Sequence, residues 1–204
     1  MTYMHTSCQS CGDSLISPLF CFSCNSLQTV SDDLDHFKVM GLPHCFEIDS
    51  VELENRYQRL TLEMHPDFFG TAPEKQKRLS EKSSVMLNAA YSSLRETASR
   101  ARYLLSLFAR EKNLQTDALP EGFLQEMFTL QEELDEMLET CDQSDLCKMN
   151  EDLQNRHTFI ESNYADLFKK FETSPENHEI LQQLQTQLNA ERYLRRLLDR
   201  INSE

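Results

Sequence analysis

The triplet His65-Pro66-Asp67 divides two stretches of the sequence that both carry the periodicity of an α-helix. Apolar residues recur at helical spacing over Ser50–Met64, where Ser50 is the expected N-cap. Proline disfavours helical backbone in the residue that precedes it, so this helix should end near His65. A second helix is predicted over Glu74–Arg95, and the polar triplet therefore lies in the loop that joins the two helices.

The rest of the chain also favours helices, because its 204 residues include only four glycines and six prolines. The sequence predicts an all-α protein of three segments, which are residues 1–31, 32–110 and 111–204. The third segment should form a three-helix bundle, since short connections make consecutive helices antiparallel neighbours. Further helices are predicted over Leu34–Met40, Arg100–Arg110, Pro120–Cys141, Ser144–Phe171 and Pro175–Ile201.

Charge is distributed unevenly along the chain, whose formal net charge is −14. Residues 1–31 and 32–110 each carry −1, whereas residues 111–204 carry −12. The acidic last segment argues against nucleic acid as a partner. No stretch approaches the roughly 18 apolar residues that span a membrane, and the N-terminus resembles neither a signal nor a transit peptide. We expect a bacterial cytoplasmic protein, or a mitochondrial matrix protein if a transit peptide precedes Met1.

Four of the seven cysteines form two C-x2-C pairs in the first segment: Cys8, Cys11, Cys21 and Cys24. Each pair lets two thiolates chelate one ion, and the two pairs together complete a tetrahedral set of sulfur ligands. We expect structural zinc here; iron in the same site and a redox dithiol are the alternatives, and His5 is a further candidate ligand. The extension should stabilise a small fold or set dimerisation of the chain. The other cysteines have no partner at ligand spacing: Cys45, Cys141 and Cys147.

Several side chains of the last segment fall away from the predicted core face of their own helix. With about 100° between successive residues, Leu124, Phe128 and Glu132 lie along one edge of the helix that begins at Pro120. Tyr193 lies on the side of the last helix that is remote from its core face. Exposed aromatic residues on two helices of one bundle predict a binding patch. The alternative is that the short helices of the middle segment cover them.

A histidine beside an aspartate also suggests a catalytic pair, but no serine or cysteine nucleophile lies near His65 and Asp67 in the sequence. The phosphate-binding pattern G-x-x-x-x-G-K-[ST] is absent from the chain. The other five histidines are scattered without the spacing of metal ligands. We therefore predict that the protein is not an enzyme and has no catalytic residue.

Helix, His-Pro-Asp loop and helix together resemble a J-domain. More narrowly, the stretch DHFKVMGLPHCFEIDSVELENRYQRLTLEMHPDFF resembles the HscB family, the J-type co-chaperones of iron–sulfur cluster biogenesis. NAAYSSLRETASRARYLLSL and FLQEMFTLQEELDEMLE are similar to the next two signatures of that family, so the resemblance covers residues 34–204. The cysteine pairs resemble the N-terminal zinc-binding extension of some members.

The resemblance implies that the J-domain, a helical hairpin, binds a DnaK/HscA-class chaperone and stimulates its ATPase. Carried over by position, His65, Pro66 and Asp67 form the activating loop. Arg56, Tyr57 and Arg59 would present a locally basic helix face to an acidic chaperone surface. A lysine commonly follows the triplet in the family, where this chain has Phe68.

The resemblance further implies that the C-terminal bundle binds the scaffold protein IscU. The family's contact positions fall on Leu124, Gln125, Phe128, Thr129, Glu132 and Tyr193. The chain departs from simple bacterial members at Gln125, Phe128 and Thr129, so the patch is less acidic and more aromatic than theirs. Two other functions compete with this interpretation. One is a general J-protein with a different client, and the other is a metal- or redox-handling protein that acts through its four cysteines.

Overall fold

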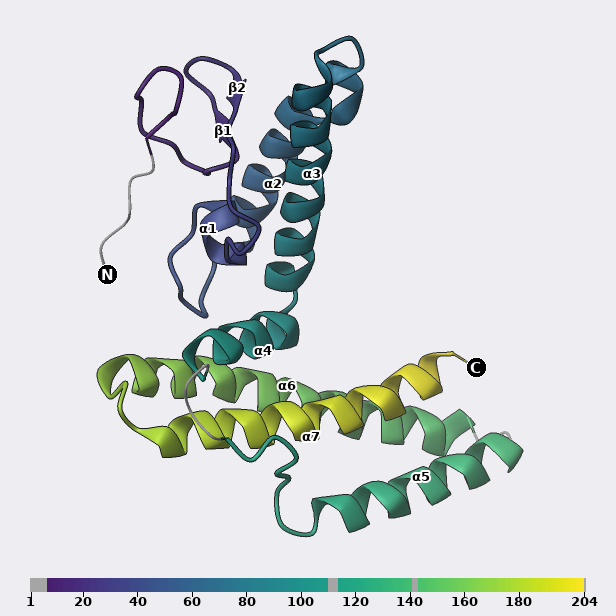
Figure 1. The fold of residues 1–204 in the computed structure, drawn as a ribbon. Coiled ribbons are helices and arrows are strands. Elements are labelled where there is room, and N and C mark those ends of the chain that lie inside the picture. The colour runs from purple at the N-terminus through teal and green to yellow at the C-terminus, as the bar shows by residue number, and fades with distance from the viewer. Residues whose placement is uncertain (1–6, 110–113, 141–142, 204) are drawn as a thin grey trace. The chain divides into compact units, whose positions relative to one another are not determined.

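The computed structural model describes residues 7–109, 114–140 and 143–203, and it confirms the predicted all-α class. Within these ranges the chain forms seven α-helices, one 3-10 turn and one two-stranded hairpin (Figure 1). It divides into two compact units, of which the first ends at Arg100 and the second begins at Ala101. The cysteine-rich extension thus shares a unit with the first helices. The segment boundaries at residues 31 and 110 stay predictions.

The first unit is built on helices α2 (Ser50–Met64) and α3 (Glu74–Arg95), with the short helix α1 (His36–Met40) packed against α3. The limits of α2 and α3 are those that the sequence predicted. The predicted cap of α2 was wrong, because Asp49 and not Ser50 precedes the helix in extended conformation. The Asp49 carboxylate accepts the backbone N–H groups of Val51 and Glu52 at 2.9 and 3.1 Å, which satisfies two free donors of the first turn.

The extension forms a small antiparallel hairpin of strands β1 (Phe20–Cys21) and β2 (Ser26–Leu27), in which Phe20 pairs with Leu27. Leu19 and Phe20 are almost completely buried. The hydroxyl of Ser17 donates to the backbone carbonyl of Val39 in α1 at 2.7 Å. Apolar burial and this hydrogen bond therefore join the extension to the helices of the first unit.

The second unit consists of the end of helix α4 (Thr97–Phe108) and helices α5 (Phe123–Thr140), α6 (Gln143–Thr173) and α7 (His178–Asn202). Helices α6 and α7 run antiparallel, and α5 lies obliquely beside them (Figure 1). Met127 and Leu134 of α5 pack into one core with Met149 and Leu153 of α6 and with the apolar face of α7. The apolar face of α7 is buried along the helix, at Ile180, Leu184, Leu188, Leu194, Leu198 and Ile201.

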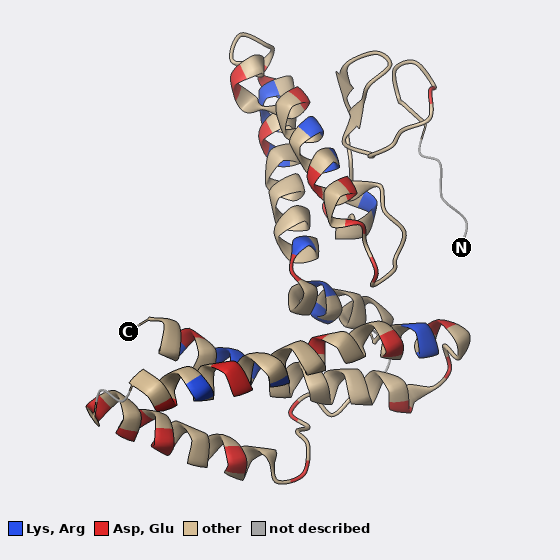
Figure 2. Cartoon of the chain, turned by 180° about the vertical axis from the view of Figure 1, so that it is seen from behind, with Lys and Arg blue, Asp and Glu red and all other residues tan. Residues whose placement is uncertain are grey.

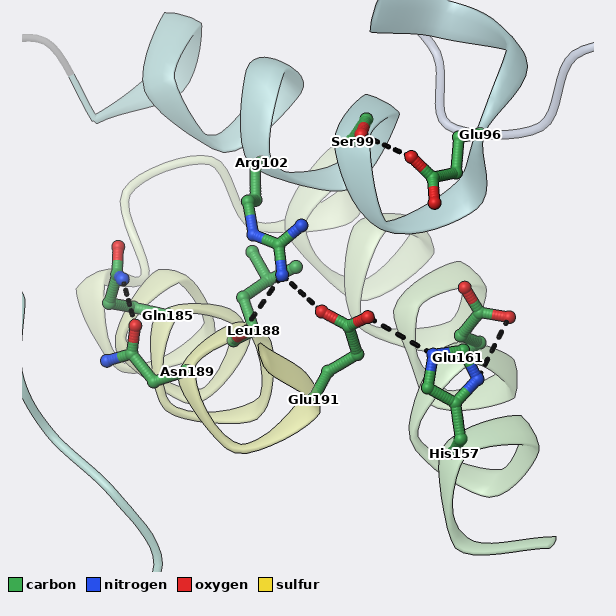
Figure 3. Close-up of polar contacts among 9 residues, drawn as sticks. All are labelled: Glu96, Ser99, Arg102, His157, Glu161, Gln185, Leu188, Asn189 and Glu191. Carbon is green, nitrogen blue, oxygen red and sulfur yellow. Dashed lines mark hydrogen bonds and ion pairs between the residues drawn. The ribbon is translucent and has the colours of Figure 1, made fainter. Parts of the chain in front are cut away.

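A buried polar cluster lies in the second unit (Figure 3). Glu191 of α7 is fully buried, and its carboxylate contacts the guanidinium of Arg102 in α4. The other oxygen of Glu191 lies 3.1 Å from Nε2 of His157 in α6, and Nδ1 of that ring lies 3.8 Å from Glu161. A carboxylate without these partners would be costly in such a place, so the cluster holds α4 and α6 on α7. No helix in the described part of the chain is both long and apolar enough to cross a membrane.

Candidate functional site

The predicted His65-Pro66-Asp67 loop is a tight turn that directly follows α2. Pro66 occupies the first position of a 3-10 turn over Pro66–Phe69, and Nδ1 of His65 accepts the backbone N–H of Asp67 at 3.3 Å. The Asp67 side chain is 87% exposed and its carboxylate lies 3.6 Å from the His65 ring. Proline fixes one backbone angle of the turn. The turn therefore presents a carboxylate to solvent from a restricted backbone.

Helix α3 fixes the point from which this turn starts. The buried hydroxyl of Ser80 donates to the carbonyl of Met64, the last residue of α2, at 2.6 Å, and Ser84 donates to the same oxygen at 3.4 Å. The final carbonyls of a helix lack partners within the helix. Because two serines of α3 satisfy this one, the end of α2 cannot move without breaking contacts to its neighbour.

The three predicted contact residues of α2 lie in different surroundings. Tyr57 stacks on Tyr91 with ring centroids 3.9 Å apart. Arg56 pairs with Glu52 and donates to the carbonyls of Met40 and Gly41 at 3.1 and 2.5 Å. Arg56 therefore ties α2 to the end of α1.

Arg59 is exposed, unlike Arg56, and its guanidinium carbon lies 3.9 Å from the centroid of the Phe22 ring in the extension. This contact was not predicted from the sequence. No periodicity or motif links two residues so far apart in the chain.

The four predicted metal ligands lie together. Their Sγ atoms are all within 4.8 Å of one another, with Cys8 and Cys24 3.6 Å apart and Cys11 and Cys21 3.7 Å apart. A tetrahedral ion with metal–sulfur bonds of about 2.3 Å requires sulfurs about 3.8 Å apart. The four residues thus fit one tetrahedral ion. His5, the further candidate, lies outside the described residues, as does Cys141.

The thiols of this cluster have strongly divergent pKa values. Burial would raise the pKa of Cys8, but the backbone N–H groups of Cys11 and Ser10 and the Ser26 hydroxyl lower it to about 5. A backbone hydrogen bond from Asp13 favours the thiolate of Cys11, yet burial and the neighbouring thiols raise its pKa to about 12. Four such sulfurs do not all ionise side by side without a positive charge among them. A bound cation would supply that charge.

Polar residues outside the cluster orient its sulfurs. The Ser26 hydroxyl lies 3.0 Å from Sγ of Cys24 and 3.7 Å from Sγ of Cys8. The buried amide of Gln28 donates to Ser26 Oγ at 2.7 Å and accepts the backbone N–H of Gln9 at 2.8 Å. Such outer hydrogen bonds fix the direction of metal ligands. Neither residue was predicted from the sequence, since a serine and a glutamine carry no motif of their own.

The predicted patch on α5 is exposed in the structure. The side chains of Leu124 and Phe128 are 43% and 62% exposed. Gln125, Thr129 and Glu132 are also exposed on this helix, so the helices of the second unit leave this edge of α5 uncovered. Helix α5 carries six acidic residues and no lysine or arginine, and these acids follow the helix in Figure 2.

Tyr193 was expected to face solvent, and this expectation was wrong. The side chain is half-buried and packs against the core of the bundle, where its ring meets Phe123 of α5 edge to face at 6.1 Å. A bundle helix contacts two neighbours, so its buried stripe is wider than the face that a single core direction predicts. Tyr193 therefore borders the patch on α5 from α7 and is partly covered there.

Comparisons with known proteins extend these observations. A scan against protein-family models gave no match. The chain is similar to the human iron–sulfur cluster co-chaperone protein HscB, with 37% identity over 118 residues that cover 57% of this chain and 50% of the human one. It is 34% identical to mouse HscB over 131 residues, 64% and 54% of the two chains. It is 35% identical to the co-chaperone protein HscB of Proteus mirabilis over 117 residues, 55% and 66% of the two chains.

Solved structures extend the similarity to nearly the whole chain. The crystal structure of human co-chaperone protein HscB matches with a TM-score of 0.73 and 26% identity, covering 97% of this chain and 98% of that one. The chaperone HscB from Vibrio cholerae matches with a TM-score of 0.68 and 25% identity, covering 83% and 96%. By sequence, the chain spans about half the length of the mammalian relatives that it matches.

Proposed function

The chain belongs to the HscB family of co-chaperones, and on that premise we propose that it stimulates the ATPase of a DnaK/HscA-class chaperone. We further propose that it delivers an IscU-type scaffold protein to that chaperone for iron–sulfur cluster transfer. The observation that carries the proposal is the exposed Asp67 carboxylate on a turn restricted by Pro66. The cytoplasm is the proposed compartment, with the mitochondrial matrix as the alternative, since bacterial and mammalian relatives both match.

In this proposal the chain performs no chemistry of its own. A carboxylate on a pre-ordered turn loses little conformational freedom when it forms a charge-assisted hydrogen bond with a partner. The chaperone hydrolyses ATP, and the J-domain accelerates that step by binding the hydrolysis-competent state more tightly than the resting state. Ser80, which holds the end of α2, supports the same turn from behind.

The scaffold would bind to the patch on α5. The exposed side chains of Leu124 and Phe128 offer apolar area, and the acids of the helix surround it. Such a surface suits a partner that combines apolar and basic residues. The half-buried Tyr193 would add an aromatic ring at the edge of the patch.

For the cysteine cluster we propose zinc in a structural role, with Cys8, Cys11, Cys21 and Cys24 as ligands and iron as the alternative. Four thiolates fill a tetrahedral coordination sphere, so no position stays open for a reacting molecule. The ion would fix the two loops of the extension to each other. Elemental analysis of the purified protein distinguishes zinc from iron.

The first experiment tests the chaperone role. ATP hydrolysis by a purified HscA-class chaperone is measured against the concentration of the chain and of its Asp67→Asn and His65→Gln variants. Loss of one charged hydrogen bond, about 1.5–3 kcal/mol, predicts at least about ten-fold weaker stimulation by Asp67→Asn. Glu63→Gln is the matched control, because Glu63 is also an exposed acid and lies just before the turn. Equal stimulation by Asp67→Asn and the wild type would contradict the proposal.

The second experiment separates an iron–sulfur co-chaperone from a J-protein with another client. Binding of an IscU protein is measured by calorimetry for Phe128→Ala and for Phe159→Ala. Both rings are exposed, by 62% and 67%, but Phe159 belongs to α6 and lies outside the patch. A contact at the centre of an interface predicts at least about a five-fold rise of Kd for Phe128→Ala alone. No measurable binding by the wild type, with ATPase stimulation intact, would favour a different client.

A further inference from the structure

The extension is built into the first unit. Gly41 ends α1 with a positive φ of 67°, and a Cβ atom added there would lie 1.8 Å from the carbonyl oxygen of Ile16. The extension thus passes over the end of α1 at a distance that only glycine permits. Lys82 of α3 donates to the carbonyl of Val30 at 3.1 Å and pairs with Asp32 at 2.6 Å. The path of the chain from the cysteine cluster to α1 is therefore fixed at two places.

One aromatic residue of the extension extends this contact to α2. Phe22 lies between Cys21 and Cys24, inside the second cysteine pair. Its ring meets Phe20 edge to face at 5.2 Å, and Phe20 is buried. The guanidinium carbon of Arg59 lies over the Phe22 ring, 3.9 Å from the ring centroid. Cysteine ligands on both sides of Phe22 mean that a bound ion fixes the backbone that carries the ring.

The contact with the Phe22 ring leaves the N–H groups of the Arg59 guanidinium available to a partner. Among the described residues, none forms a hydrogen bond or ion pair with Arg59. Arg56, the other arginine of α2, donates to backbone carbonyls and to Glu52. A planar guanidinium that stacks on a ring still directs its N–H groups outward in its plane, where they can bind a carboxylate in bidentate fashion.

We infer that Phe22 is a positioning residue, which holds Arg59 ready for an acidic surface of the ATPase chaperone and makes chaperone affinity depend on metal bound by the extension. This inference rests on the proposed function. A free arginine side chain loses much rotamer freedom on binding, and the ring removes part of that cost beforehand. The metal acts only through the backbone that carries Phe22. The effect lies in affinity, since the activating Asp67 belongs to a different part of the unit.

The test uses the full chain with and without metal. Phe22→Leu removes the aromatic face and keeps apolar volume, Phe22→Tyr restores the face, and Arg59→Ala removes the cation. An exposed cation–π contact predicts that Phe22→Leu raises the concentration for half-maximal ATPase stimulation by about two- to five-fold and leaves the maximum unchanged. Phe22→Tyr should match the wild type. In the Arg59→Ala background, Phe22→Leu should have no further effect.

A second readout does not depend on the chaperone. In the metal-loaded chain, the Arg59 Nε–H resonance should be shifted by the ring current of Phe22. Chelation of the metal and Phe22→Leu should each remove that shift, and chelation should raise the half-maximal concentration to the same extent. Zinc content measured for each variant verifies that the extension remains loaded.

The outcomes separate the two claims. If the wild type stimulates, Asp67→Asn does not, and Phe22→Leu equals the wild type, the inference about Phe22 is overturned and the proposed function stands. Additive effects of Phe22→Leu and Arg59→Ala would also overturn the inference. If the wild type fails to stimulate, the proposed function is wrong and the inference falls with it, even if the Arg59 resonance shifts as expected.

Discussion

Replacing Arg102 with methionine should lower the free energy of unfolding of the second unit by about 3 kcal/mol. The Glu191 carboxylate has no solvent exposure and contacts Arg102 of α4 and His157 of α6 (Figure 3). The Arg102→Met variant removes one partner and leaves the buried charge to the other. Loss of one member of a buried ion pair costs about 3–5 kcal/mol. We expect the lower end, because His157 remains and because the Arg102 side chain is 35% exposed.

The assay is urea unfolding followed by far-ultraviolet circular dichroism, together with a thermal scan. For a unit of the size of Ala101–Glu204, about 3 kcal/mol corresponds to a Tm lower by about 12–24 °C. Arg192→Met is the matched control, since Arg192 is the exposed neighbour of Glu191 on α7. It should change the free energy of unfolding by no more than about 0.5 kcal/mol.

A double substitution tests the reason for the loss. Arg102→Met combined with Glu191→Leu removes both charges, and apolar replacement of a whole buried pair is close to neutral. The double variant should therefore regain most of the stability that Arg102→Met loses. The reasoning is refuted if Arg102→Met costs less than about 1 kcal/mol, or if the double variant is less stable than the single one.

Three further perturbations address the first unit. Gly41→Ala should destabilise this unit by more than Gly12→Ala does, as measured by urea unfolding. Both glycines have a positive φ, but only a Cβ atom at position 41 would clash with the backbone, at the carbonyl of Ile16. Chelation of the metal should lower stability by at least about 2 kcal/mol, with Tm restored by added zinc. Burial of the Asp35 carboxylate would raise its pKa. The hydrogen bonds that it accepts from Lys38 and His44 outweigh this effect and hold the pKa below its usual 3.8. The ionised Asp35 therefore stabilises the fold above about pH 4, and this stabilisation is lost as the pH falls through the lowered pKa of the folded state. Asp35→Asn should accordingly make the decrease of Tm between about pH 5 and pH 3 less steep.

Features with a local signal in the sequence were predicted well. Proline before the turn and apolar periodicity around it are properties of neighbouring residues, and the limits of α2 and α3 follow from them. The start of α4 was placed at Arg100 and lies at Thr97. Asp49 and Ser50 are both good caps, so the sequence alone does not decide which of them ends the extended backbone. The cysteine spacing sufficed to predict four sulfurs at one place.

Features that depend on distant residues were not predicted. Arg59 meets Phe22 only because the extension folds over α2. Glu191 did carry a signal, because it follows Leu184 and Leu188 at helical spacing and so occupies a core position of α7. A charge at such a position indicates a buried partner. The identity of that partner, Arg102 of α4, depends on packing between helices that the sequence does not specify.

Charge also assigns the two proposed partners to different surfaces. The acidic chaperone surface that would accept Arg59 is repelled by α5, which carries six acids and no basic residue. Helix α2 carries three glutamates and two arginines, so it offers a basic scaffold surface much less negative charge than α5, which has six acids and no basic residue. On the proposed function, the chaperone would be disfavoured at α5 by like charge, and the scaffold would prefer α5 because its negative charge is greater than that of α2.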